Sequence, residues 1–492
     1  MKYLFSIALI ITVFCSVVKA ETYKLTLDES INIAKEKSYR MLTLTQDLKI
    51  AEYRLKSATS SLKTHINMNL TLPDYTERVR EKSDSTGIFF GEKVITYSGG
   101  LTINQPLPTD GRIYVQSGLS SFRNYFDGNY SANVNTRIGF SQPLDALYGY
   151  NAIKSSLRTA QLEYERTSKV LRREELNLVY SVSSAYYNLL SLQKQTEISM
   201  LDLERQTEAF DISQKKYEAG LIREVDALQM EVDLADAQST YDMALLSQNS
   251  AINSFKELLG IDLHDEITLS SELDYKIVVV EPEKAVSMAL ANRTELREQD
   301  IQIENQKINL KRQKAYGMIR GNINAYVEKV GVADPNSSYG FGNSINNSFN
   351  NVVDRPFSYG VGFTVSVPVF DWGENRSLVR AAEVRLKQAD IDKVQIQRDI
   401  ETEVRNLAIG VNSDLKRLQL LEKNLQVAEK SFEITLHRFS DGDIDSQSLA
   451  LERNRLNNAY RSHLSAYIKY QLALADLMRR TFYDFRNDEV VK

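Results

Sequence analysis

The sequence predicts an α+β membrane protein in which very long helices alternate with strands long enough to cross a bilayer. Three observations predict this fold class: long tracts without proline that have helical apolar spacing, segments between them that alternate with period two, and an N-terminal segment with the features of an export signal. The chain has 492 residues, of which 25% are charged and 42% hydrophobic, so wholesale disorder is excluded.

Residues 1–20 have the features of a signal peptide. An apolar run from Leu4 to Val18 follows a short positive start, and Ala20 occupies the last position before a predicted cleavage site. The run is short for a membrane helix, and no later stretch of about 18 residues is apolar. We therefore expect the mature chain to begin at Glu21, and any later crossing of a membrane to use strands.

Two tracts predict helices much longer than those of compact soluble domains. Residues 151–217 and 376–438 contain no proline, and their apolar residues recur at three- and four-residue steps. At roughly 1.5 Å per residue, the first tract would be about 100 Å long. Each tract ends at a glycine turn, after which a helix of 34 residues returns, at 226–259 and at 448–481.

Two more helices, each of 36 residues, are expected at 27–62 and 283–318. One of these helices and one return helix together nearly equal a long helix in length. Two short helices stacked end to end would therefore span the same height as one long helix. This arithmetic predicts a helical cylinder built from hairpins.

Apolar and small polar residues alternate along the segments between the helices. The alternation is clearest at 66–72, 134–140 and 359–367, and less regular at 96–105, 112–122 and 319–328. Each segment is about as long as a tilted membrane strand. A soluble antiparallel sheet with one buried face has the same alternation. The export signal, the small polar second face and the 26 tyrosines, which could form interfacial girdles, favour a membrane sheet.

The connectors between these segments differ in length and polarity. Residues 74–93 and 331–355 are long and polar, as expected of outward-facing loops, whereas 106–111 predicts a tight turn. The two kinds of connector therefore predict opposite ends of the sheet.

The two halves of the chain repeat each other. Pro143 and Pro368 lie in similar tetrapeptides, and the turn glycines Gly220 and Gly442 stand at nearly the same offset. The sequence therefore predicts an internal duplication, in which each half is helix, strands, long helix, glycine turn and helix.

The predicted repeats are residues 21–280 and 281–492. Between matching points the first repeat has 30 more residues than the second, enough for one extra strand hairpin near 107–136. Counting strands gives four in the first repeat and two in the second.

This order and two motifs resemble the TolC-like outer membrane efflux protein family, over essentially the whole chain after the signal. One motif, Pro368-Val-Phe-Asp-Trp-Gly-Glu-Asn-Arg376, links a strand to a long helix; the other, Tyr217-Glu-Ala-Gly220-Leu-Ile, forms the first glycine turn. The resemblance implies a homotrimer whose strands close one outer-membrane β-barrel, continued by a long periplasmic α-helical barrel. It also implies a passive exit duct of a tripartite efflux or type I secretion system. Substrates would reach it from an inner-membrane pump through a periplasmic adaptor (a membrane fusion protein).

The strand count departs from the family pattern. Family members typically contribute four strands each, hence twelve in the trimer, whereas six here would give eighteen. The extra hairpin near 107–136 either widens the barrel or folds outside it.

The acidic residues of the closed end also depart from the family pattern. The resemblance implies aspartates at the positions of Ser448 and Leu451, which are not acidic here. Asp441, Asp443 and Asp445 crowd the second glycine turn instead and are the candidate periplasmic gate, because three copies would stack carboxylates around one axis. The alternative is that the aspartates only end one helix and cap the next.

Both glycine turns are candidate contact points for the adaptor. The residues concerned are Gly220, Leu221, Ile222, Gly442 and Ile444. The resemblance implies that such tips contact the adaptor, and the alternative is packing against the neighbouring hairpin.

Composition excludes several other functions. Four scattered histidines without metal-ligand spacing predict no metal site, and the single cysteine, Cys15, lies in the predicted signal peptide. The net charge of −5 gives no basic excess for nucleic acid. No catalytic residue and no cofactor are expected, and outer-membrane lipid is an expected partner. A periplasmic coiled-coil adaptor or structural scaffold is the alternative function, but it leaves the duplicated strands unexplained.

Overall fold

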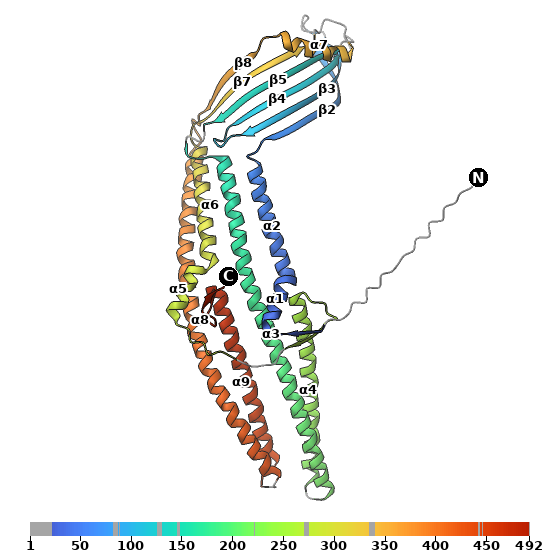
Figure 1. Cartoon of the computed structure of the whole chain (residues 1–492), viewed down its shortest axis with the longest axis vertical. Coiled ribbons are helices and arrows are strands. Elements are labelled where there is room, and N and C mark those ends of the chain that lie inside the picture. The colour runs from blue at the N-terminus through green and yellow to red at the C-terminus, as the bar shows by residue number, and fades with distance from the viewer. Residues whose placement is uncertain are drawn as a thin grey trace, which may run out of the picture. The chain divides into compact units, whose positions relative to one another are not determined.

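Figure 1 shows a computed structural model of the chain. The chain divides into two compact units. The hairpin unit comprises residues up to 45, 171–294 and 397 onward, and the sheet unit comprises 46–170 and 295–396. The described residues are 22–81, 87, 89–124, 130–144, 148–220, 222–269, 275–333, 340–440, 443–444 and 446–491. The predicted signal peptide, residues 1–20, lies outside them.

The two long helices are confirmed almost to the residue. α3 spans Ala152–Glu218 and α8 spans Glu374–Ser440, each with 67 residues. The return helices α4 (Glu224–Leu259) and α9 (Ser446–Thr481) have 36 residues each, so each begins two residues before the predicted start. The absence of proline therefore located all four helices correctly.

The two expected helices of 36 residues are each broken, which corrects the prediction. The first divides into α1 (Leu27–Lys37) and α2 (Tyr39–Ser60), and the second into α5 (Pro282–Asn292) and α6 (Thr294–Tyr316). The residues between them, Ser38 and Arg293, are extended, with ψ of 135° and 127°. Each still donates its amide to the carbonyl four residues before, so the helix ends by a turn of the chain and not by fraying.

Gly260 explains the first of these breaks. It ends α4 at a φ of 72°, and a Cβ there would lie 2.4 Å from the carbonyl oxygen of Lys37. The end of α4 thus approaches the end of α1 more closely than any side chain would allow. The contact joins residues more than two hundred positions apart, so no local pattern predicted it.

The hairpin unit is held by a core of aromatic rings between its helices. Tyr470, Phe255 and Leu259 are fully buried, and the rings of Tyr187 and Tyr467 meet edge to face at 6.1 Å. Short strands add two small sheets. These strands are β1 (Thr22–Leu25) parallel to β6 (Glu266–Leu269), and β9 (Tyr483–Asp484) antiparallel to β10 (Glu489–Val490).

Six described strands of the sheet unit form one antiparallel sheet, in the order β2-β3-β4-β5-β7-β8 (Figure 1). They are β2 (His65–Glu81), β3 (Phe89–Pro106), β4 (Arg112–Asn124), β5 (Tyr130–Pro143), β7 (Arg320–Val332) and β8 (Ser358–Ser366). The predicted strand count of six is confirmed. The two described strands of the extra hairpin, β4 and β5, belong to the sheet, because β4 pairs with β3 and β5 pairs with β7.

The register of the strands puts apolar side chains on one face of this sheet. Ile138 of β5 stands opposite Val115 of β4 and Val327 of β7, and the same face holds Met68 and Val361. Met68 is 67% exposed and Val361 80%. Most of this apolar face is not covered by other described residues, as expected of a surface that contacts lipid.

Residues 74–93 are mainly strand and not the long loop that their polarity predicted. The pairing of β2 with β3 continues to Glu81 and Phe89. Glu77 stands directly opposite Lys93, and their side chains form an ion pair of 3.3 Å. Cross-strand pairs of opposite charge stabilise a solvated ribbon, so polarity alone did not distinguish this ribbon from a loop.

Residues 331–355 also contain a helix that the sequence did not predict. The helix α7 spans Phe341–Asp354, between β7 and β8, where a polar loop was expected. Its Asn- and Ser-rich sequence hides a helix whose small side chains pack on the sheet: Ser344 and Ser348 are fully buried.

None of the helices in the described ranges carries an apolar window long enough to cross a membrane.

Candidate functional site

The second face of the sheet is polar and carries a row of alternating tyrosine and glycine. Tyr114, Gly139, Tyr326 and Gly360 stand side by side on β4, β5, β7 and β8. A Cβ on Gly139 would lie 2.2 Å from the Tyr114 ring, and one on Gly360 would lie 2.7 Å from Tyr326. The rings therefore lie flat on the glycines and project little from this face.

One ion pair lies in the neighbouring row of side chains on the same face. Arg137 of β5 donates to Glu328 of β7 at 2.6 Å, and its guanidinium lies 4.4 Å from the centre of the Tyr326 ring. The cation is thus paired and stacked at once, which fixes its position. The polar face presents hydroxyls, amides and a paired charge, a surface suited to water.

In the sheet unit, charged pairs join neighbouring helices. Arg158 of α3 donates through two nitrogens to Glu304 of α6, at 2.7 and 3.1 Å, and Arg297 of α6 donates to Glu165 of α3 at 2.6 and 2.9 Å. The hydrogen bonds from Arg297 lower the pKa of Glu165 below its usual range. Both pairs bridge the same two helices in a two-pronged geometry, so they fix the register of α3 against α6.

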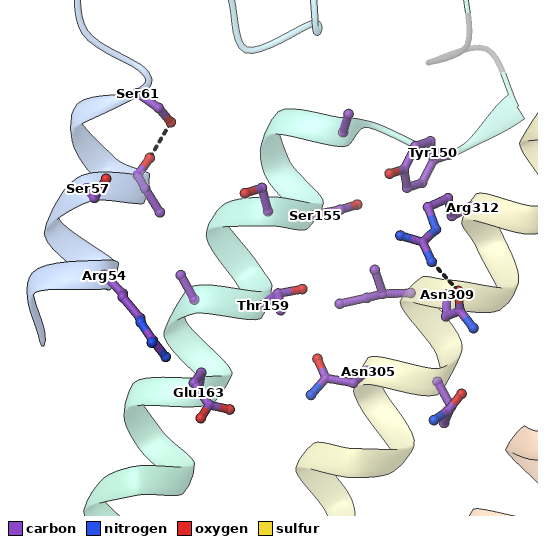
Figure 2. Close-up of a pocket in the computed structure, with 16 residues that line it drawn as sticks. Arg54, Ser57, Ser61, Tyr150, Ser155, Thr159, Glu163, Asn305, Asn309 and Arg312 are labelled. Carbon is purple, nitrogen blue, oxygen red and sulfur yellow. Dashed lines mark hydrogen bonds between the residues drawn. The ribbon is translucent and has the colours of Figure 1, made fainter. Parts of the chain in front are cut away.

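A cavity of about 920 Å³ opens between α2, α3 and α6 (Figure 2). Arg54 reaches from α2 toward α3, while Ser155 and Thr159 point from α3 toward α6. Asn305 of α6 carries a buried Oδ1 without a hydrogen-bond partner. Nine of its sixteen lining residues carry a hydroxyl or an amide, but apolar atoms supply most of the lining surface, and the lining contains no histidine or cysteine. It offers no pairing of a nucleophile with a base.

The described part of the chain also holds no group of three histidine, cysteine or acidic side chains that could bind a metal ion.

The candidate gate lies partly within the described residues. Asp443 is exposed, and its amide donates to the carbonyl of Arg438 at 2.9 Å, which closes the end of α8. Asp441 and Asp445 lie outside the described residues. The gate therefore stays a prediction.

The candidate adaptor tips are described in part as well. Gly220 has a φ of 70°, and its amide donates to the carbonyl of Tyr217 at 2.8 Å. Ile222 and Ile444 are half-buried. Leu221 and Gly442 lie outside the described residues.

The helix pairs beneath these turns are joined in the hairpin unit. Asn457 of α9 donates to Asp202 of α3 at 3.3 Å, and the guanidinium of Arg205 lies 5.3 Å from the Phe432 ring of α8. α3 thus contacts both α8 and α9, so the two helical hairpins pack against each other.

The tyrosine–glycine row and the bidentate pairs were not predicted from the sequence. Both join residues far apart in the chain, and only a known strand register or helix pairing would have indicated them. The alternating glycines of 360 and 362 were the one local signal.

A sheet with an exposed apolar face and a polar face, joined to long polar helices, defines a membrane channel of the strand-and-helix type. Residues 113–261 and 285–481 match the family model for outer membrane efflux proteins. The chain therefore belongs to the outer membrane efflux protein family.

Two curated relatives are similar over most of the chain. The outer membrane protein TolC of Vibrio cholerae is 22% identical over 342 residues, which cover 67% of this chain and 74% of that protein. The alkaline protease secretion protein AprF of Pseudomonas aeruginosa is 22% identical over 355 residues, 70% of this chain and 69% of that protein.

Solved structures show the same fold. The CmeC outer membrane channel of Campylobacter jejuni has a TM-score of 0.69 at 13% identity, covering 97% of this chain and 91% of that chain. The open MtrE outer membrane channel of Neisseria gonorrhoeae has a TM-score of 0.66 at 15% identity, covering 95% and 90%.

These findings confirm the predicted family and function. The protein is an exit duct of efflux or secretion systems, located in the outer membrane with its helical part in the periplasm. Members of this family are transport ducts and not enzymes, and the alternative of a periplasmic scaffold is set aside.

Proposed function

We propose that three copies of the chain close their sheets into one barrel of eighteen strands, through which substrates leave the cell. The observation that supports this most is the continuous six-stranded sheet with its exposed apolar face. In the described part of a single chain, β2 and β8 are edges whose backbone groups lack partners on one side. A bilayer does not tolerate such edges, and closure with neighbouring copies removes them.

The number of strands sets the width of the pore. Strands about 4.8 Å apart and tilted by about 40° give a backbone diameter of about 36 Å for eighteen strands, against about 24 Å for twelve. The test is a heat-modifiable trimer on a gel, followed by polymer-exclusion conductance measurements in a planar bilayer. A monomer without a heat shift refutes the trimer, and a pore of the narrower size refutes eighteen strands.

The chain is also proposed to be an internal duplication of residues 21–280 and 281–492. Support comes from equal element lengths in the two halves and from matching helix breaks at Ser38 and Arg293. Ala34 and Ala289, which accept the amides of these residues, are both fully buried. The test is to exchange the two α-helical hairpins, which a true duplication tolerates with retained trimers.

At the periplasmic end, Asp441, Asp443 and Asp445 are proposed to form the gate. Three copies would bring like charges together around one axis, so bound cations would favour closure and loss of charge would weaken their effect. The variant Asp443→Asn is expected to reduce the closure of single channels by divalent cations. Glu433→Gln, an exposed change on α8, is the matched control, and equal cation sensitivity of the two variants excludes the gate.

The glycine turns are proposed to bind a periplasmic adaptor, which would connect the duct to an inner-membrane pump. The residues concerned are Gly220, Leu221, Ile222, Gly442 and Ile444. Ile222→Ser together with Ile444→Ser is expected to abolish copurification of the adaptor after crosslinking, with the trimer intact. Unchanged copurification would show that these side chains pack within the hairpins instead.

A further inference from the structure

The helix α7 lies on the apolar face of the sheet, at the end away from the long helices (Figure 1). A Cβ on Gly331 of β7 would lie 1.9 Å from the carbonyl oxygen of Ser348 in α7. Gly331 pairs with Val134, which shares its face of β5 with Ile138. α7 therefore covers the outer end of the face that carries the exposed apolar side chains.

Small and polar side chains attach α7 to this face. Ser348 donates its hydroxyl to the carbonyl of Ala132 at 2.7 Å, and Asn351 donates to the carbonyl of Val332 at 3.0 Å. Ser344 is fully buried one turn before Ser348. The side of α7 that touches the sheet is thus small and hydrogen-bonded at the serines, and at its first residue Phe341 meets the rings of Tyr97 and Tyr130 edge to face at 5.5 and 5.8 Å.

Three of the larger apolar side chains of α7 lie on one flank, whereas Phe341 and Val352 lie against the sheet. At about 100° per residue, Ile345, Phe349 and Val353 fall on one flank, beside the buried serines. Phe349 is 52% exposed and Val353 is 74% exposed. The opposite flank consists of Asn343, Asn347 and Asn351, of which Asn343 is exposed.

The contacts with β7 show how these flanks are directed. Asn351, on the asparagine flank, donates to the carbonyl of Val332, the last residue of the strand. Lys329, three residues further from that end, donates to the carbonyl of Val353 at 3.2 Å. The apolar flank therefore faces the middle of the strands, and the asparagine flank faces their outer ends.

This orientation makes the apolar flank continuous with the exposed band of the sheet. Tyr359 and Val361 of β8, on the same face, are 81% and 80% exposed. No sheet or helix of the described chain covers Phe349 and Val353, although water is a poor neighbour for both. We therefore expect Phe349 and Val353 to be covered by the same apolar material that covers the exposed face of the sheet.

We propose that α7 is an interfacial membrane helix whose apolar flank is covered by the acyl chains of the outer leaflet. Its asparagine flank then lies among the headgroups, where amides find hydrogen-bond partners. Amphipathic helices that lie in an interface bury their apolar face in this way. The inference rests on the proposed barrel, because it takes lipid to be the neighbour of the apolar face.

Quenching of tryptophan fluorescence by brominated lipid tests the proposal. The chain has one tryptophan, Trp372, so Trp372→Phe gives a silent background. Single tryptophans are then introduced by Phe349→Trp on the apolar flank, Asn343→Trp on the asparagine flank and Ile138→Trp in the sheet. Each protein is reconstituted into phosphatidylcholine vesicles with bromine on the acyl chains, after its heat-modifiable trimer is verified.

We expect quenching at position 349 at least about twofold stronger than at position 343, because the apolar side of an interfacial helix lies several ångströms inside the headgroup boundary. If neither Ile138→Trp nor Phe349→Trp is quenched, the proposed barrel fails. If only Ile138→Trp is quenched, the assignment of α7 fails while the barrel stands. In that case, quenching of the same tryptophan by acrylamide, which is dissolved in the water, gives the reason. Strong quenching means that water reaches position 349, and weak quenching means that a neighbouring copy covers it. Both results overturn the proposal.

Discussion

Replacing Gly331 by alanine should loosen α7 from the sheet. The new Cβ would lie 1.9 Å from the carbonyl oxygen of Ser348, and real Cβ atoms essentially never approach closer than 3.0 Å, so the helix must withdraw by at least about 1.1 Å. That movement stretches the bonds of Ser348 to Ala132 and of Asn351 to Val332, now 2.7 and 3.0 Å, beyond hydrogen-bonding distance. Two such bonds contribute about 2 kcal/mol together, which corresponds to about a thirtyfold change in local opening.

Hydrogen exchange of the trimer in detergent, read by mass spectrometry, measures this opening. Amides of residues 341–354 should exchange about thirtyfold faster in Gly331→Ala, while those of 323–329 in β7 keep their rates. Gly362→Ala is the control, because a Cβ there meets no described atom within 4 Å. Equal exchange of α7 in the two variants would show that Gly331 does not set the approach of the helix.

Three further predictions concern stability, followed by circular dichroism of the trimer. Tyr470→Phe should lower the free energy of unfolding by about 2–3 kcal/mol, because the buried hydroxyl accepts from the Val278 amide at 3.0 Å and donates to a carbonyl at 2.9 Å. Gly260→Ala should destabilise by more than about 1 kcal/mol, since φ is 72° and the backbone is in the way, whereas Gly410→Ala inside α8 should stabilise by about 0.5–1 kcal/mol. The pKa of Glu165 is lowered by hydrogen bonds from Arg297. Its contribution to the free energy of unfolding is therefore complete above about pH 4.3 and is lost as the pH falls through the lowered pKa. Glu165→Gln should remove this acid-side slope, worth at most about 1 kcal/mol because both partners are more than a third exposed, and an unchanged slope would contradict the assignment.

The long helices were predictable because their signal is local. Proline is absent and apolar residues recur at helical steps throughout α3 and α8, so the predicted ends fall within two residues of the observed ones. The breaks at Ser38 and Arg293 carry no glycine or proline. At the first, a contact with Gly260 sets the break, and a contact across two hundred residues leaves no local pattern.

The sheet was predictable in its strand number and less so in its extent. Alternation located all six strands, but the charged ends of β2 and β3 and the helix α7 were both taken for polar loops. In each case the segment was predicted to be a loop because its residues are polar. Its actual structure depends on the residues with which these polar side chains pair. Glu77 has Lys93 opposite it, and Ser348 has a strand carbonyl beneath it.

The six strands also fit the width of the helical wall to which they connect. Four described helices, α2, α3, α6 and α8, continue from the sheet within the sheet unit. Helices packed about 9–10 Å apart make a wall about 38 Å wide. Six strands about 4.8 Å apart and tilted by about 40° occupy nearly the same width, whereas four would occupy about 25 Å. With the extra hairpin, the sheet is thus about as wide as the wall of helices. We therefore expect the narrowest part of the duct at its periplasmic end and not in the membrane.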